Sequence, residues 1–275
     1  MDADRFLGEL PRLFDDFPHS EHPIDRRFAP IAEGIENLAR ENNLALLNLA
    51  ARCLDPDKAY VEVGVFHGAS LISAMLGNEG KRFVGIDSFD FRDATLEKVE
   101  ANLADYDLPR PELLVGDAFA LVPGGALGDA AIGVWYYDAS HSYEAQLDGL
   151  RIAEPLLVPG ALVVVDDTDW DDVSRAMDDY LESQPRARRI VTIDGKDRGF
   201  PHWWEGMQVL VWDARAPSLR PPPSGGLQGS WRERNAARAD SARCKETTSR
   251  GSSGGGSARC RYGRSARTSR CTSVP

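Results

Sequence analysis

The stretch AYVEVGVFHGAS (59–70) decides how the chain folds. Residues 59–65 form an apolar run of strand length, and Gly64 and Gly68 allow a tight turn before a helical stretch at 69–76. The same order, a short apolar strand followed by a helix, recurs along the chain. Strands that alternate with helices form a parallel sheet with helices on both faces. We therefore expect an α/β fold.

Further apolar runs continue this pattern and mark the other strands and helices. Strands are predicted at 82–87, 112–117, 131–138 and 161–167, and helices at 95–106, 142–157 and 171–183. The last two strands, 188–194 and 207–213, are joined by a segment rich in Gly and aromatic residues and without a helix. Such a connection suits a hairpin, so the final strand should run antiparallel.

The pattern predicts a Rossmann-like domain over residues 58–214, built on a mostly parallel seven-stranded sheet. Two helices are predicted before it, near 3–16 and 28–54, so we expect residues 1–57 to form an N-terminal helical extension or lid.

Charge divides the chain into two parts. Residues 1–213 carry 19 Lys and Arg against 40 Asp and Glu, giving −21, whereas residues 214–275 carry 13 against 3, giving +10. The acidic part repels phosphate backbones, which argues against nucleic acid as its ligand. The basic part has too few apolar residues to offset the entropy of ordering, so we predict that 215–275 is disordered. It is either an Arg-rich binding arm or a non-native extension, and its composition favours the second interpretation.

Targeting signals and cysteine spacing bear on the compartment. No apolar run reaches the roughly 20 residues of a membrane span, and MDADRFLGEL (1–10) is too acidic and polar for a signal peptide. Cys53 is the one cysteine before the basic part, and the other cysteines match no zinc or disulfide spacing. We expect a soluble, cytoplasmic protein with no membrane partner.

Acidic residues follow several predicted strands, at the edge where open α/β sheets bind ligands. Asp87 ends the second strand, 23 residues after Gly64, where a carboxylate that binds ribose hydroxyls belongs. Asp117 ends the third strand, where a carboxylate can meet an adenine edge. A single Asp at a strand end is more often a helix cap or turn former. Their repetition in order favours ligand binding.

Asp138, Asp166 and Asp167 follow the fourth and fifth strands. Three carboxylates that converge in a cleft repel one another unless a cation or a proton intervenes, and their oxygens suit Mg²⁺ or a similar ion. The alternative is that Asp167 caps the helix that starts near Trp170, while Asp166 faces water.

Histidine and tryptophan supply further candidates. His141 lies three residues after Asp138, and with an ordinary pKa of ~6.5 it can take a proton from an acceptor hydroxyl. It can equally cap a helix or hold Asp138 in place. The remaining candidates have weaker assignments. His67 is expected to have a packing role, and His19 and His22 to belong to a lid. The segment with His202, Trp203 and Trp204 is expected either to form a wall of an acceptor pocket or to cover the sheet edge.

The series VEVGVFHGAS, GIDSFD, GDAF, YYDASHSYEAQLDGL and PGALVVVDD resembles class I methyltransferases that use S-adenosylmethionine, in particular the branch of macrocin O-methyltransferase-like and cephalosporin hydroxylase-like proteins. The resemblance covers roughly 58–213 and implies the class I methyltransferase fold. In this chain Phe66 stands where the wider superfamily has the middle glycine of Gly-x-Gly-x-Gly.

The resemblance also implies residue roles. Around the methionine part of the cofactor it places Glu62, Gly64, Gly68 and Ser70. It places Asp87 at the ribose and Asp117 with Ala118 at the adenine. At the matching positions Asp138, Asp166 and Asp167, the branch binds a divalent ion.

Together these features predict a divalent-metal-assisted O-methyltransferase that uses S-adenosylmethionine, with His141 and Asp138 as its catalytic residues. The expected acceptor is a hydroxyl of a small molecule, a sugar or an aromatic natural product. Two alternatives stay open, namely a hydroxylation-accessory enzyme of the same fold and a non-catalytic nucleotide-binding or scaffold protein. Whether the chain forms a homo-oligomer is also open.

Overall fold

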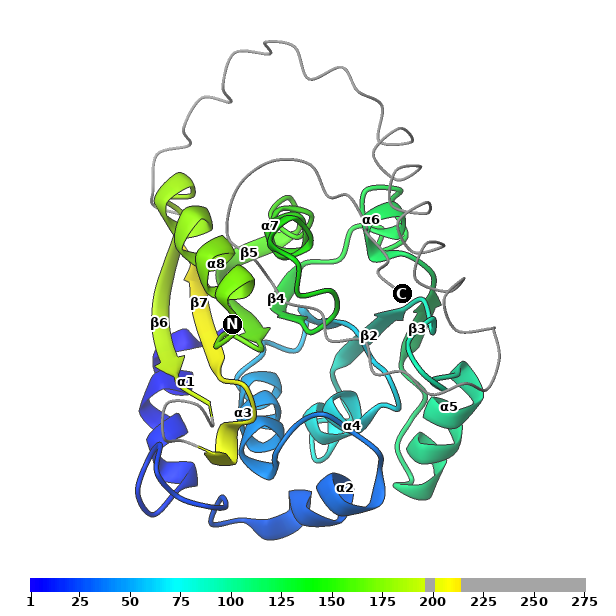
Figure 1. Cartoon of the computed structure of the whole chain (residues 1–275). Coiled ribbons are helices and arrows are strands. Elements are labelled where there is room, and N and C mark those ends of the chain that lie inside the picture. Colours follow the sequence, from blue (N-terminus) through cyan, green and yellow to red (C-terminus); the bar gives the residue numbers. More distant parts are fainter. Residues whose placement is uncertain (196–200, 214–275) are drawn as a thin grey trace, which may run out of the picture. The chain divides into compact units, whose positions relative to one another are not determined.

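The computed structural model describes residues 1–195 and 201–213 (Figure 1). The disorder predicted for 215–275 lies outside the described residues. Among the described residues, no helix is long and apolar enough to cross a membrane. The strands are β1 (Ala59–Val63), β2 (Arg82–Asp87), β3 (Glu112–Val115), β4 (Ile132–Tyr137), β5 (Leu157–Asp166), β6 (Ala187–Ile193) and β7 (Met207–Trp212).

All seven strands form one sheet in the order β3-β2-β1-β4-β5-β7-β6. The five strands from β3 to β5 pair in parallel, whereas β7 runs antiparallel to both β5 and β6. Between β6 and β7, the described residues hold one short 3₁₀ helix, η4 (Pro201–Trp203). β6 and β7 form a hairpin, because they are consecutive strands that pair antiparallel, and such a return, unlike a parallel crossover, needs no α-helix. The mostly parallel sheet with an antiparallel strand near its end is confirmed.

Helices cover both faces of the sheet, as predicted (Figure 1). The helices are α1 (Ala3–Glu9), α2 (Ala29–Gly34), α3 (Glu41–Arg52), α4 (Ala69–Met75), α5 (Leu96–Asp105), α6 (Ala118–Leu121), α7 (Tyr143–Arg151) and α8 (Asp171–Ser183). Alternate strand residues enter two separate cores, so that Tyr136 packs with α3 and α4 whereas Trp135 and Tyr137 pack with α7 and α8.

The N-terminal helices are shorter than the sequence pattern predicts. After α1 the chain tightens into the 3₁₀ helix η1 (Leu10–Leu13), where Pro11 is in the first turn and lacks a backbone N–H. The stretch near 28–54 divides into the 3₁₀ helix η2 (Arg26–Phe28), α2 and α3, because the chain becomes extended at Ile35 after α2. Likewise α7 ends at Arg151, ahead of Pro155, instead of continuing to 157.

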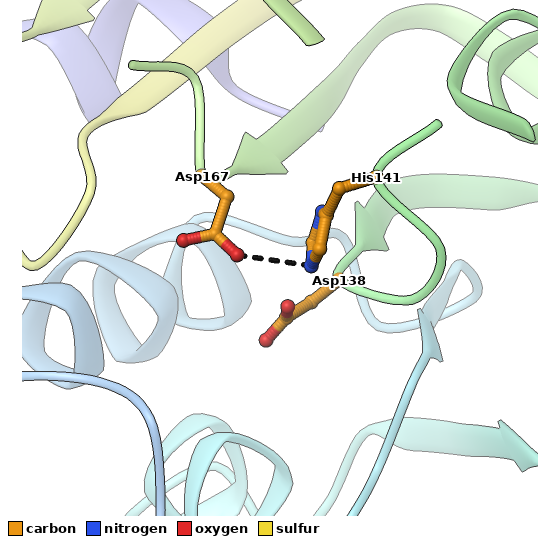
Figure 2. Close-up of side chains that lie close together, drawn as sticks. All are labelled: Asp138, His141 and Asp167. Carbon is orange, nitrogen blue, oxygen red and sulfur yellow. Dashed lines mark ion pairs between the residues drawn. The ribbon is translucent and has the colours of Figure 1, made fainter. Parts of the chain in front are cut away.

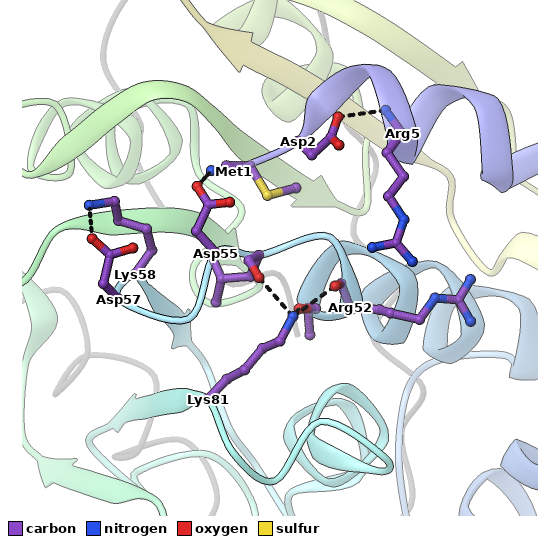
Figure 3. Close-up of polar contacts among 10 residues, drawn as sticks. Met1, Asp2, Arg5, Arg52, Asp55, Asp57, Lys58 and Lys81 are labelled. Atoms are coloured by element: carbon purple, nitrogen blue, oxygen red, sulfur yellow. Dashed lines mark hydrogen bonds and ion pairs between the residues drawn. The ribbon is translucent and has the colours of Figure 1, made fainter.

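The N-terminal helices are tied to the sheet by polar contacts at the end of α3 (Figure 3). The Lys81 ammonium donates to the carbonyls of Ala51, Arg52 and Leu54 at 2.7, 2.7 and 2.8 Å. These carbonyls belong to the last turn of α3 and the residues after it, where a cation is favoured by the helix dipole. The amino group of Met1 pairs with Asp55 nearby. The end of α3 therefore joins the N-terminus to the residue that precedes β2.

Candidate active site

The turn between β1 and α4 is held by a single carboxylate. Asp87 accepts hydrogen bonds from the backbone N–H groups of Val65 and Phe66 at 2.7 and 2.8 Å. Its other oxygen accepts from the N–H of Phe89 at 2.6 Å. Phe66 adopts a left-handed conformation with φ 52°, which is costly for an aromatic residue, and these bonds stabilise it. Asp87 thus lies at the end of β2, as predicted, and organises the turn, whereas its contact with ribose stays a prediction.

Gly64 joins this turn to the end of β4. It has φ +94°, and a Cβ at this position would overlap the backbone carbonyl of Asp138. Gly68, with φ +91°, starts α4. Both glycines therefore meet backbone requirements that other residues satisfy poorly. Through Gly64, the turn that follows β1 is in direct backbone contact with the residue that follows β4.

Glu62 is fully buried beneath the turn. Its carboxyl accepts hydrogen bonds from the Ser70 hydroxyl at 2.6 Å and from the Tyr60 hydroxyl at 3.1 Å. Burial, with a contribution from the charge of Asp138, raises the pKa of Glu62 to about 8. Glu62 is therefore mainly neutral at pH 7, and the structure places it and Ser70 in contact with each other. Their predicted contact with the methionine part of the cofactor stays a prediction.

Asp117 starts the short helix α6. Its carboxylate accepts a hydrogen bond from the backbone N–H of Phe119 at 2.9 Å, which is the usual role of Asp at a helix N-terminus. The next residue, Ala118, is buried. A contact of either residue with adenine stays a prediction.

Three side chains that offer metal-ligand atoms converge beyond β4 and β5 (Figure 2). They are Asp138, His141 and Asp167, and one ligand atom from each lies within 4.8 Å of the others. His141 Nε2 and Asp167 Oδ2 are 2.9 Å apart. Because β4 and β5 are parallel neighbours, the residues that follow them come together at one edge of the sheet.

The turn that carries Asp167 is strained and clamped. Asp167 has φ 54°, an uncommon conformation for a residue other than glycine. The N–H of Asp169 donates to Glu205 O at 2.8 Å, and the Asp169 carboxylate accepts from the N–H of Gly195 at 2.7 Å. These bonds attach the turn to the segments beside the β6–β7 connection. Asp167 does not cap α8, because its carboxylate pairs with His141 and α8 has no side-chain cap.

Asp166 lies just inside this edge and is 2% exposed, so it does not face water. The Tyr136 hydroxyl lies 2.9 Å from Asp138 Oδ2 and 3.1 Å from Asp166 Oδ2, and it joins the two carboxyl groups. Burial and the charges of Asp138 and Asp167 hold the pKa of Asp166 well above its usual range. Because a hydroxyl has one hydrogen, Tyr136 donates to Asp138 when a neutral Asp166 donates to the phenol oxygen.

Groups of this cluster change one another's pKa values. Burial and the charge of Asp167 raise the pKa of Asp138 to about 6. Burial by itself lowers the pKa of His141, but the hydrogen bond to Asp167 and the charges of Asp167 and Asp138 outweigh it, so the pKa is raised. Perturbed carboxyl and imidazole groups beside a pocket are typical of functional sites.

An open pocket of about 740 Å³ adjoins the cluster through His141. Its lining consists of the loop after β4, the start of α8 and one residue that follows β2, namely Ala139, Ser140, His141, Ser142, Trp170, Asp171, Asp172 and Phe91. Phe91 and Tyr136 were not predicted from the sequence as site residues, and Trp170 was predicted only as the start of a helix. The available signal for Phe91 and Trp170 was an aromatic residue a few positions beyond an acidic strand end.

The weaker candidates lie elsewhere. His67 stacks on Phe66 with ring centroids 3.9 Å apart, in the packing role expected for it. Trp203 is fully buried, and its indole N–H donates to Pro18 O at 2.8 Å, so it covers the core instead of lining the pocket. His22 pairs with Glu41 at 3.2 Å.

Comparisons with known proteins agree with this architecture. Residues 61–168 match the sequence model of a protein family described as "Methyltransferase domain", a range that runs from β1 to the turn after β5. The prediction of a class I methyltransferase domain is confirmed, whereas its narrower branch stays a prediction. None of the curated proteins compared with the chain matches it.

Several solved structures share the fold. The O-methyltransferase TomG from Streptomyces achromogenes, which is involved in tomaymycin synthesis and was solved in complex with S-adenosylmethionine, is 20% identical, with a TM-score of 0.54 over 78% of this chain and 99% of TomG. The cofactor-bound protein Rv0187 from MTB is 20% identical, with a TM-score of 0.53 over 77% of this chain and 96% of its own. A Corynebacterium glutamicum protein is 16% identical, with a TM-score of 0.54 over 77% of this chain and 97% of its own.

Proposed function

We infer that the methyltransferase domain makes this chain an O-methyltransferase that moves a methyl group from S-adenosylmethionine to a hydroxyl of a small molecule with the help of a divalent cation. The observation that carries this inference is the cluster of Asp138, His141 and Asp167 beside the pocket. It lies beyond the same sheet edge as the turn held by Asp87. A binding site for the methyl donor and a site that activates a hydroxyl are therefore adjacent.

The turn after β1 suits S-adenosylmethionine. Gly64 and Gly68 lack side chains, so a ligand can approach the backbone of the turn closely. Asp87 accepts three backbone N–H groups and still has free lone pairs, and these can accept hydrogen bonds from ribose hydroxyls. Asp117 and Ala118 start the next helix along the same edge and are our candidates for the adenine contact. The likeness to TomG, which was solved with this cofactor, supports the assignment.

The acidic cluster suits a hard divalent cation such as Mg²⁺. Two carboxylates and an imidazole offer ligand atoms within 4.8 Å of one another. Asp167 Oδ1 and Asp166 Oδ1 are buried, and neither has a hydrogen-bond partner among the described residues. A cation would satisfy such oxygens and relieve the repulsion that raises these pKa values. We propose Asp138 and Asp167 as ligands, and we keep Asp166 as a further ligand because of its free oxygen.

Chemistry at this site requires a hydroxyl that has lost its proton and is aligned with the methyl group. When bound, S-adenosylmethionine supplies the methyl group, and a divalent cation lowers the pKa of a nearby hydroxyl. Asp167 orients the imidazole of His141 through Nε2, and Asp138 stands beside it. His141 in its neutral form is our candidate to receive the hydroxyl proton. The acceptor is a sugar or an aromatic natural product; the role of TomG in tomaymycin synthesis supports a natural product.

The metal role is tested by methyl transfer to a panel of hydroxylated acceptors. We expect activity to disappear in EDTA and to return with Mg²⁺ or Mn²⁺. Asp138→Asn should lose activity and keep S-adenosylmethionine binding, measured by calorimetry. Asp178→Asn is the matched control, because Asp178 is an exposed carboxylate on α8 that pairs with Arg189 and does not line the pocket. Full turnover in EDTA would contradict the metal role, and absence of S-adenosylmethionine binding would contradict the function itself.

A further inference from the structure

Two exposed aromatic side chains face the pocket beside the acidic cluster. Among the described residues, the large apolar side chains that are exposed are Leu7, Ile24, Leu38, Phe91, Val115 and Trp170. The two aromatic members of this set, Phe91 at 52% and Trp170 at 49%, both line the same pocket. Exposed aromatic surface is costly in water, and its concentration in one pocket points to a ligand that covers it.

Trp170 is the aromatic residue next to the reacting groups. Its ring centroid lies 5.4 Å from that of His141, and its backbone N–H donates to Asp167 O at 3.1 Å. It therefore starts α8 from the same clamped turn that carries Asp167. Phe91 instead lies 5.6 Å from Phe66, on the side of the turn after β1. We assign Trp170 to the acceptor and leave Phe91 on the side of the cofactor.

The charge of the pocket lining restricts the acceptor. Asp171 and Asp172 are both part of the lining, and none of the described lining residues is Lys or Arg. Asp172 is partly neutralised by Arg175 at 2.9 Å. The two carboxylates occupy the first turn of α8, where a bound phosphate would otherwise be favoured by the helix dipole. A phosphate or carboxylate on the acceptor would meet repulsion from this wall.

We propose that the acceptor is an aromatic hydroxy compound without phosphate or carboxylate groups, neutral or cationic, whose ring stacks on Trp170. Its hydroxyl then reaches the cluster of Asp138, His141 and Asp167. This inference rests on the proposed function and narrows it, because it selects aromatic acceptors over nucleotide-linked sugars. An indole face supplies flat apolar contact to an aromatic ring, and a cation gains further from the acidic wall.

Equilibrium binding to the full chain tests the proposal without requiring turnover. Calorimetry is performed with saturating S-adenosylhomocysteine and Mg²⁺, using catechol, the cationic 3,4-dihydroxyphenethylamine, the anionic 3,4-dihydroxybenzoate and uridine diphosphate glucose as probes. We expect the cationic catechol to bind most tightly, then neutral catechol, then the anion, with the nucleotide sugar weakest. The advantage of the cation over the anion should shrink in high salt, because exposed charges are screened.

Four variants, one of them a control, separate the contribution of ring stacking from that of charge. Trp170→Leu should weaken catechol binding about three- to tenfold, whereas Trp170→Phe, which keeps a flat ring, should stay within about twofold. Asp171→Asn should reduce the preference for the cation about two- to threefold. Asp178→Asn removes a negative charge from α8 outside the pocket lining and should leave all four affinities unchanged.

The outcomes for the two proposals are distinct. Tighter binding of uridine diphosphate glucose than of the catechols, no binding of any catechol, or equal affinities for wild type and Trp170→Leu would each overturn the aromatic acceptor. Binding of S-adenosylmethionine and transfer of its methyl group to any hydroxyl, which leaves S-adenosylhomocysteine, are measured on the same protein. If that transfer occurs on a nucleotide sugar, the proposed function stands and this inference falls. If S-adenosylmethionine does not bind, the proposed function fails whatever the catechols do.

Discussion

The candidate site has two halves, one at the ends of β1 and β2 and one at the ends of β4 and β5, and the carboxylate charge is stabilised differently in each. At the ends of β1 and β2, the Asp87 carboxylate accepts three backbone N–H groups, so its charge and the turn satisfy each other. At the ends of β4 and β5, carboxyl groups face one another, the pKa values of Asp138 and Asp166 are raised, and Asp167 keeps a buried oxygen without a partner among the described residues. The first half is complete by itself. The second needs a cation or protons to offset the repulsion between its carboxylates, which is the observation behind the proposed metal site.

The largest effect should come from the glycine that connects the halves. Gly64→Ala places a Cβ against the carbonyl of Asp138 at a backbone φ of +94°, so both the turn and the end of β4 must move. We expect a loss of about 4 kcal/mol or more in the free energy of unfolding, measured by urea denaturation. Gly80→Ala is the control, because a Cβ at Gly80 meets no atom within 4 Å. Equal stability of the two variants would show that the halves are not in tight contact.

The next effect is the pH dependence that Glu62 imposes on stability. Its folded-state pKa of about 8 exceeds the ordinary 4.5, so the folded chain binds the extra proton between these values. The contribution of this group is fully present below pH 4.5 and is lost as pH rises through 8. Gln at this position stays neutral at every pH. The Glu62→Gln variant should therefore lack on the order of 3 kcal/mol of the fall in unfolding free energy that the wild type shows as pH rises. Melting temperatures from pH 5 to 9 measure it. Parallel curves for variant and wild type would mean that Glu62 is already ionised.

A variant of Asp87 tests whether S-adenosylmethionine binding at the first half is independent of Mg²⁺ binding at the second. Asp87→Ala should weaken S-adenosylmethionine binding tenfold or more, equivalent to ~1.5–3 kcal/mol, because it loses ribose acceptors and the bonds that hold Val65 and Phe66. Calorimetry on the folded variant measures this, and Mg²⁺ affinity should stay unchanged. Unchanged S-adenosylmethionine affinity would remove Asp87 from the cofactor site.

The smallest effect should come from Tyr136, whose hydroxyl joins Asp138 to Asp166. Tyr136→Phe leaves the ring in the core and removes only these bonds. We expect Mg²⁺ binding to weaken by about 0.5–1.5 kcal/mol while S-adenosylmethionine affinity stays constant. Calorimetry with each ligand alone separates the two. A loss of S-adenosylmethionine binding of the same size would show that the halves are not independent.

Much of the fold could be predicted because its central strands, such as β1, β4 and β7, are apolar runs buried along their whole length. The run at 82–87 is β2 with the predicted bounds, and 171–183 is α8. Errors lie where local signals are weak, such as the helix expected near 28–54, which divides at Ile35. The four-residue α6 is too short to show a period and was not predicted. The domain limits at 57 and 214 stay predictions.

By itself, the sequence determined which strand ends carry carboxylates, and therefore that Asp87, Asp138 and Asp167 would meet at one edge of a parallel sheet. The carboxyl ends of parallel strands lie at one edge of a sheet whatever the strand order, so this much needs no contact information. Only the tertiary structure decided how each carboxylate is used. Three backbone N–H groups meet Asp87, the Tyr136 hydroxyl meets Asp138 and Asp166, and His141 meets Asp167. Those partners are set by side-chain direction and burial, which depend on packing between elements distant in sequence.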